Sequence, residues 1–293
     1  MQDLRHSLRL LGQARTFTLA AVLALALGIG LNTAIFSVVN AVLLKPTPFP
    51  QSDRLVFFTT VSPDGSDNSG SPAKFAYWRQ QSAAIEDAAA FSDGVLNWTG
   101  QAFPEQLRSA QVSVDYFRLF GAQVLRGRTF TAEEDQPKGS HVALIRESLW
   151  RRRFSSQDAT LGQTIELGNE PHLIVGIIAD SFDASDIGNQ PEVWVPFQLN
   201  LQSGDQGHYF SAAARLKPGV SVAQANAALA ASTPAYKATY PDAIDANNSF
   251  GVESLAESLV SNVRPTLLVL LAAVGLVLLI ACANVANLLL ARA

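Results

Sequence analysis

Three histidines in the polar middle of the chain, His141, His172 and His208, are the side chains best suited to chemistry. An imidazole can serve as a general base or as a metal ligand, but a metal site needs several ligands that converge on one point. We find none of the three paired with another histidine, a cysteine or an acidic residue at a spacing typical of metal ligands. We therefore predict incidental surface or core positions for all three, and no metal ion.

Two charged runs are also candidate binding sites. Glu133–Asp135 follows Thr131 in a pattern typical of a helix start, with Thr131 as N-cap and Glu134 completing a capping box. Capping is favoured over a divalent cation site because oxygen ligands must converge from separate positions. Arg151–Arg153 could contact an acidic partner or lipid headgroups, but a solvated helix face is the favoured interpretation.

Motifs of common catalytic and cofactor sites are missing from the sequence. It contains no Gly-x-Ser-x-Gly, no Walker A phosphate loop and no Cys-x-x-Cys, and its one cysteine is Cys282. Gly28-Ile29-Gly30 is not a dinucleotide fingerprint, because it lies inside an apolar helix rather than after a strand. We expect no catalytic residue, no cofactor and no enzymatic activity.

Two long uncharged stretches, Thr16–Leu44 and Pro265–Ala291, enclose 220 mostly polar residues. An apolar run of about 18 residues or more can satisfy its own backbone as a helix in lipid. Basic residues flank both stretches: Arg5, Arg9, Arg15 and Arg292. Because positive flanks stay in the cytoplasm, the sequence predicts two transmembrane helices, 17–44 and 265–293, with both termini cytoplasmic and residues 45–264 periplasmic.

A cleavable signal peptide is the alternative for the first stretch, because Ala24-Leu25-Ala26 resembles a cleavage site. A retained helix is favoured, since the apolar region of a signal peptide runs only about 7–15 residues. Ahead of this helix, Asp3–Gln13 is predicted to be a short amphipathic helix, so that residues 1–16 form a cytoplasmic segment at the inner leaflet.

The insert between the apolar stretches is acidic. It holds 17 of the 21 lysines and arginines and 24 of the 25 acidic residues, a net charge of −7. Such a surface is poorly suited to nucleic acid. The insert has no cysteine, so its stability must come from a core rather than from disulfides.

The insert contains a β-rich segment between two segments in which strands and helices are mixed. Strands are expected at 55–61, 111–114, 142–145, 164–167, 173–178, 193–196 and 210–216. Helices are expected at 75–91, 147–154, 220–240 and 253–264, and 116–120 is a short apolar run before Gly121. Because the β-rich part separates two α/β parts, the pattern predicts an α+β membrane protein whose discontinuous α/β subdomain carries an inserted β-rich subdomain.

Small and amide residues within the two apolar stretches are candidates for helix packing. The set is Gly28, Gly30, Asn32, Asn40, Gly275, Asn284 and Asn287. Amides cannot ionise, so they indicate interhelical hydrogen bonds rather than a proton relay. Packing between these two helices and packing against further membrane helices are about equally favoured. Val38–Leu44 and Leu255–Val263 are predicted to prolong the helices as stalks.

Several segments together resemble the MacB/FtsX-type ABC transporter permeases, most closely an orphan subgroup that carries the module twice without a fused ATPase. They include Leu25–Gly30 running on to Asn32–Asn40, Gly127–Phe130, Gly162–Ile165 and Ile280–Arg292. The resemblance implies a periplasmic MacB-like core domain with a Porter-like part at 45–122 and 207–258 and a Sabre-like part at 123–206. It also implies a bacterial inner-membrane permease subunit for export or mechanotransmission.

The resemblance further implies partners: a separate cytoplasmic ABC ATPase, further permease helices or a second module, and the lipid bilayer. Family modules have four membrane helices with a coupling helix after the second, so the sequence is expected to stop short of the segment that contacts the ATPase. The alternative is a two-span membrane sensor with an extracytoplasmic ligand-binding domain, which would need a cytoplasmic output domain.

Overall fold

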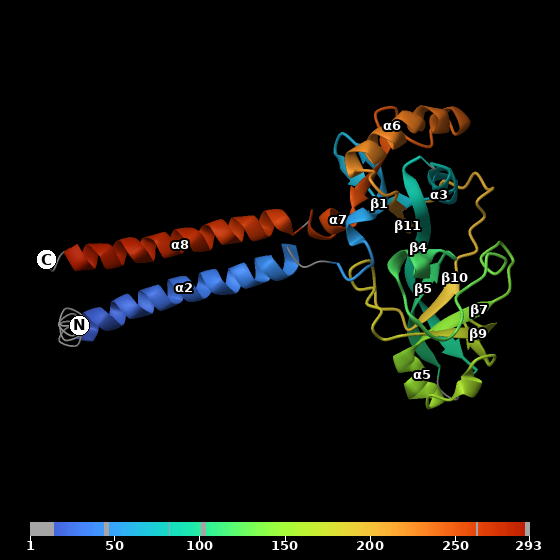
Figure 1. The fold of residues 1–293 in the computed structure, drawn as a ribbon, viewed down its shortest axis with the longest axis horizontal. Helices are drawn as coiled ribbons and strands as arrows, with labels where there is room; N and C mark the ends of the chain where they lie inside the picture. Colours follow the sequence, from blue (N-terminus) through green and yellow to red (C-terminus); the bar gives the residue numbers. More distant parts are fainter. Residues whose placement is uncertain (1–14, 44–46, 82, 101–103, 262, 291–293) are drawn as a thin grey trace. The chain divides into compact units, whose positions relative to one another are not determined.

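The computed structural model describes residues 15–43, 47–81, 83–100, 104–261 and 263–290. The chain forms two compact units, one of residues 1–46 and 259–293 and one of residues Thr47–Ser258 (Figure 1). We call these the helical unit and the large unit. The predicted amphipathic helix Asp3–Gln13 lies outside the described residues.

The helical unit consists mainly of two long helices, α2 (Arg15–Leu43) and α8 (Arg264–Leu290), which pack side by side (Figure 1). Among the described residues, α8 is the one helix long and apolar enough to cross a membrane, over Arg264–Asn287. The apolar part recognised in α2 is shorter, Ala26–Asn40.

The predicted continuous helix from Glu253 into the second apolar stretch is wrong. Glu253 belongs to a strand, a short helix α7 spans Leu255–Ser261, and α8 begins afresh at Arg264. Pro265 explains the interruption, since in a continuous helix its ring would clash with the carbonyl of Ser261, whereas the first turn of α8 tolerates it.

The large unit is built on one mixed sheet, for which the described residues supply 12 strands. Its main path runs β12-β1-β11-β4-β5-β10-β7-β9-β6, with β2, β3 and β8 paired alongside. Neighbouring strands are antiparallel except for β5 with β10 and β7 with β9. The strands are β1 (Leu55–Ser62), β2 (Gly65–Asp67), β3 (Ser69–Gly70), β4 (Ile85–Thr99), β5 (Glu105–Val112), β6 (Val124–Gly127), β7 (Val142–Arg146), β8 (Thr164–Leu167), β9 (Glu170–Ile178), β10 (Val193–Pro196), β11 (Phe210–Leu216) and β12 (Ser249–Ser254).

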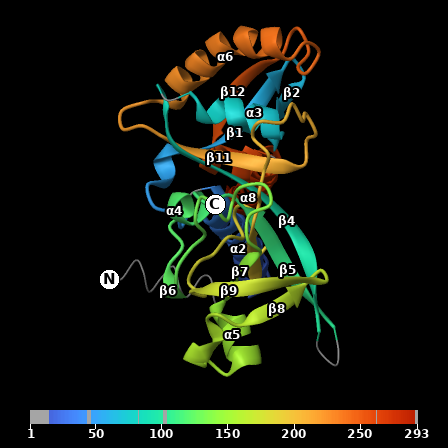
Figure 2. The same ribbon diagram turned by 90° about the vertical axis from the view of Figure 1, so that its right-hand side faces the viewer.

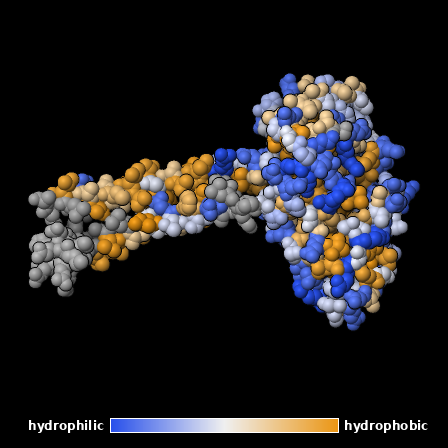
Figure 3. Space-filling model, in the orientation of Figure 1, coloured by the Kyte–Doolittle hydropathy of each residue, from blue (hydrophilic) through white to orange (hydrophobic). Residues whose placement is uncertain are grey.

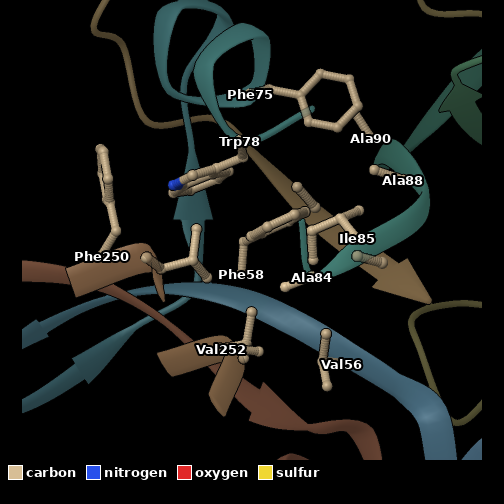
Figure 4. Close-up of a cluster of buried hydrophobic side chains, with 14 of the residues drawn as sticks. Val56, Phe58, Phe75, Trp78, Ala84, Ile85, Ala88, Ala90, Phe250 and Val252 are labelled. Carbon is tan, nitrogen blue, oxygen red and sulfur yellow. The ribbon is translucent and has the colours of Figure 1, made fainter. Parts of the chain in front are cut away.

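The first core lies where α3 (Pro72–Arg79) and α6 (Val222–Thr239) cover β1, β11 and β12. Trp78 of α3 is fully buried and stacks on Phe58 of β1, with ring centroids 4.8 Å apart, while Phe250 meets its edge (Figure 4). Ser71 caps α3 by accepting a hydrogen bond from the backbone N–H of Lys74, and Ser221 forms a capping box on α6. These caps fix the starts of the two helices against the sheet.

The second core lies where α5 (Glu147–Phe154) meets the other half of the sheet, formed by β7, β8, β9 and β10 (Figure 2). Its residues come from positions 98–195, whereas those of the first core come from 56–90 and 210–252. Trp98 and Leu107 pack in the second core. The Porter-like range 45–122, which the family resemblance implies, includes both residues and would place them with the first core. The long strands β4 and β5 carry the sheet from one core to the other.

The predicted helix over Phe75–Phe91 is wrong in its second half. The helix ends at Arg79, and β4 begins at Ile85. Ala88–Ala90 has high helix propensity, but it pairs in β4 with another alanine run, Ala212–Ala214 of β11, and all six side chains are buried. Burial in a central strand overrides local propensity here.

Most other predicted elements agree with the structure more closely, but the strand predicted at 111–114 is only the end of β5, which spans Glu105–Val112. Helix α5 and strands β8, β10 and β11 have the predicted bounds, while α6 lies within its predicted range. The short apolar run Tyr116–Phe120, for which the sequence indicated no element type, forms a helix, α4. The strand β12 and the great length of β4 were missed.

Candidate functional site

Gly28 and Asn32 lie where α2 contacts α8. Gly28 is buried, and a Cβ built there would lie 3.0 Å from Leu278 Cδ1 and 3.7 Å from Ala281 Cβ. One helical turn later, the amide Nδ2 of Asn32 donates to the carbonyl of Gly28 (2.9 Å) and to that of Val274 in α8 (3.2 Å). A small residue that admits close approach is thus followed by an amide that bonds across the helices.

The other helix-packing candidates lie elsewhere on the helix surfaces. A Cβ at Gly30 or Gly275 would meet nothing within 4 Å among the described residues. Asn40, Asn284 and Asn287 are exposed in this helix pair. The amides of these three asparagines can therefore form hydrogen bonds with groups outside the helix pair.

The outward faces of both helices are strongly apolar (Figure 3). Leu27 and Phe36 of α2 and Val269 and Leu279 of α8 are each at least 60% exposed. In α2 the hydroxyls of Thr33 and Ser37 donate back to the carbonyls of Ile29 and Thr33. Such internal pairing of polar groups is what a lipid environment requires.

The acidic run after Thr131 is structural, but it does not start a helix. Glu134 and Thr131 exchange both bonds of the predicted capping box, yet the backbone forms turns there. Arg128 holds Glu134 through two hydrogen bonds of 2.7 and 2.8 Å. The carboxylate of Asp135 accepts from the backbone N–H groups of Val114 and Gln198. The run therefore anchors its own loop to the segments that follow β5 and β10.

The three arginines Arg151–Arg153 lie on the exposed face of α5, as predicted. They pair with acidic groups of the same unit: Glu147, Asp180, Glu105 and Glu192. Exposed ion pairs of this kind contribute little individually, typically about 0–1 kcal/mol. They satisfy the positive charge locally, so no outside partner is needed to explain it.

The prediction that the histidines are unconnected is wrong for two of them. Parallel pairing of β7 with β9 brings His141 beside His172, and their rings stack with centroids 5.2 Å apart. Glu170, two residues before His172, reaches the same place. That Glu-x-His spacing within one strand was the available signal, since alternate residues share a face.

The third histidine contacts a buried lysine. Lys74 of α3 is 1% exposed, and its amino group lies 3.0 Å from Thr60 Oγ1 and 2.8 Å from His208 Nε2. Asp67 lies 3.8 Å from the other ring nitrogen of His208. Burial lowers the pKa of Lys74, and burial followed by the charge of Lys74 lowers the pKa of His208.

These contacts predict a pH effect on stability. Because the pKa of His208 is lower in the folded chain than its unfolded value of about 6.5, only the unfolded chain gains this proton as pH first falls through that value. The large unit should therefore lose stability from about pH 7.5 to about pH 5.5. His208→Gln should lose less over the same interval, because it lacks that proton uptake.

Urea unfolding followed by tryptophan fluorescence measures this effect, since the four tryptophans, Trp78, Trp98, Trp150 and Trp194, all lie in the large unit. Titrating groups common to both proteins cancel in the comparison. An equal loss of stability in the parent and in His208→Gln would contradict the prediction.

Comparison with known proteins identifies the large unit. The family model described as the MacB-like periplasmic core domain matches residues 18–232, more than half of the chain. The chain belongs to this family. The matched region is that of the periplasmic domain of a permease rather than of an ATPase. With the apolar helix α8, it indicates a membrane protein that carries an extracytoplasmic MacB-like domain.

Curated relatives share part of this similarity. The macrolide export ATP-binding/permease protein MacB 1 of Yersinia pestis is 31% identical over 115 residues, which is 39% of this chain and 18% of that protein. The MacB protein of Salmonella typhi is 27% identical over the same length and coverage. The chain therefore matches less than a fifth of the length of either relative.

Solved structures share the fold at lower identity. The periplasmic region of MacB from Actinobacillus actinomycetemcomitans superposes with a TM-score of 0.52 at 13% identity, covering 73% of this chain and 94% of that one. A domain of a permease protein from Porphyromonas gingivalis gives 0.54 at 17% identity, covering 70% and 92%. At these identities the likeness establishes the fold alone.

Proposed function

We propose that this chain is a non-catalytic permease part of an ABC-type, MacB/FtsX-like system for export or mechanotransmission in a bacterial inner membrane. The observation that carries the proposal is the order along the chain. The MacB-like match begins within α2 and continues into the large unit, α8 follows that unit, and the two helices pack on each other with apolar outward faces. Helices paired in this way can couple one side of a membrane to a domain on the other.

In this proposal α2 and α8 both span the membrane, the two termini are cytoplasmic, and residues 45–264 are periplasmic. Tilt or stalk-like projection accommodates a helix as long as α2, whose 29 residues extend about 43 Å at 1.5 Å per residue. In this proposal the Porter-like part, 45–122 and 207–258, holds the first core, and the Sabre-like part, 123–206, holds most of the second core, to which the Porter-like segment adds Trp98 and Leu107.

The proposed partners are a cytoplasmic ABC ATPase and further permease helices. Asn40, Asn284, Asn287, Gly30 and Gly275 support the latter, since these small and amide residues lie outside the α2–α8 contact and can pack against additional helices. No part of the proposal requires the chain to hydrolyse ATP itself.

The test is co-purification from membranes of the native host. The reading frame that contains this chain, carrying an affinity tag and extracted in mild detergent, should retain an ABC ATPase in a fixed ratio. ATP hydrolysis by that ATPase should differ between the free subunit and the complex. A tagged protein that retains no ABC ATPase, or one that carries a cytoplasmic kinase or cyclase domain, would contradict the permease assignment.

A further inference from the structure

The exposed edge of the second core holds a cluster of two imidazoles and one carboxylate. His141 immediately precedes β7, and its carbonyl accepts a hydrogen bond of 3.0 Å from the backbone N–H of Leu173 in β9. This pairing places His141 next to His172, with the two rings inclined by only 21°. The Glu170 carboxylate lies 3.6 Å from Nδ1 of His141.

One nitrogen from each ring and one oxygen of Glu170 all lie within 4.8 Å of one another. Ligands of a tetrahedral zinc ion stand about 2.0–2.2 Å from the metal, so they lie somewhat closer to one another than the 4.8 Å limit found here. His141 and Glu170 have side chains that are 41% and 63% exposed and can turn about their own χ angles. His172 is 8% exposed and stays in place.

The orientation of the buried ring is set by the backbone. His172 Nδ1 lies 2.9 Å from the carbonyl oxygen of Glu170. A carbonyl can only accept, so Nδ1 carries the proton, and in the neutral ring Nε2 keeps a free lone pair. Metal-binding histidines are commonly held in this way, with the second ring nitrogen donating to a carbonyl or carboxylate.

We propose that His141, Glu170 and His172 form a binding site for one divalent transition-metal ion of the zinc class, with water completing its coordination. Imidazole ligands favour zinc and its neighbours, whereas magnesium and calcium favour sites made of oxygen atoms alone. The bound ion would join the start of β7 to the start of β9, next to the Gly168–Asn169 turn. Its role would be to brace the second half of the sheet.

Calorimetric titration of the whole purified chain with Zn²⁺, without a histidine tag, tests the site. The parent should bind one ion per chain. His141→Ala and His172→Ala should each weaken binding by about tenfold or more. Loss of a residue that only hydrogen-bonds to a metal ligand already costs about that much, and loss of a ligand should cost at least as much. His208→Ala is the matched control, because His208 belongs to the same unit but lies outside the cluster, and its binding should equal that of the parent.

Glu170→Gln keeps the proposal testable if loss of the buried His172 impairs folding, since Glu170 is exposed. Zn²⁺ should raise the unfolding temperature of the parent and of His208→Ala, and should raise that of Glu170→Gln much less. Co²⁺ in place of Zn²⁺ should give visible absorption that both single histidine variants lose. Absence of saturable binding, or equal binding by the parent, His141→Ala and Glu170→Gln, would overturn the site.

Discussion

Gly127→Ala should destabilise the large unit by roughly 3 kcal/mol or more. Gly127 ends β6 with φ of +74°, in a backbone conformation that costs other residues about 1–2 kcal/mol. A Cβ there would also lie 2.2 Å from the carbonyl oxygen of Val175 and 2.9 Å from Cα of Gly176. Both are backbone atoms of β9 that cannot swing away, so the overpacking cost, typically about 1–3 kcal/mol, adds to the first.

Gly162→Ala is the matched control for this experiment. Gly162 also has a positive φ, of +82°, but a Cβ there would meet nothing within 4 Å among the described residues. It should cost only the conformational part, about 1–2 kcal/mol. Urea unfolding followed by tryptophan fluorescence gives both values. Equal destabilisation by the two substitutions would show that the close approach of Gly127 to the backbone of its neighbouring strand β9 adds nothing to the cost.

The pair Gly28→Cys and Ala281→Cys, in a Cys282→Ser background, should oxidise almost completely to a disulfide. The Cβ separation of 3.7 Å matches the mean of about 3.8 Å found in disulfides. The end of the flexible Leu278 side chain must shift by a few tenths of an ångström to admit the new Cβ. Counting free thiols in the unfolded protein with a maleimide mass tag measures the result.

Gly30→Cys with Ala281→Cys is the control, because Gly30 lies on the same helix but would meet no atom within 4 Å. This pair should keep both thiols. The Gly28 pair should therefore carry no mass tag and the Gly30 pair two. If the Gly28 pair stays reduced, or if both pairs oxidise equally, then α2 and α8 do not pack through Gly28.

Local signals predicted much of the large unit. The bounds of β8, β10 and β11 follow from short apolar runs near Gly, Pro and Asn, which interrupt strands. The alanines of β4 could not be placed in this way. Their local preference is helical, and only the partner run in β11, over 120 residues later, makes them a strand.

Candidate sites were harder to predict, because they depend on contacts between segments far apart in the sequence. Seven small or amide residues were candidates for helix packing, but the rotation of α2 against α8 decides that Gly28 and Asn32 face the partner helix while Gly30 does not. His141 and His172 lie far apart in the sequence, and only the parallel pairing of β7 with β9 reveals them as neighbours. The periodicity of a sequence predicts which residues share a face of a helix or strand. It does not predict which other element packs against that face.

The direct test of the proposed permease is its topology in the membrane. Single cysteines replace the exposed residues Ser66 and Gln202 of the large unit, and Ser7 of the N-terminal segment, each in a Cys282→Ser background. In intact cells with a permeable outer membrane, an impermeant thiol reagent should label the cysteines at positions 66 and 202. The cysteine at position 7 should react only after the inner membrane is opened. Protection of positions 66 and 202 in intact cells, or labelling of position 7, would contradict a permease with a periplasmic domain between two membrane helices.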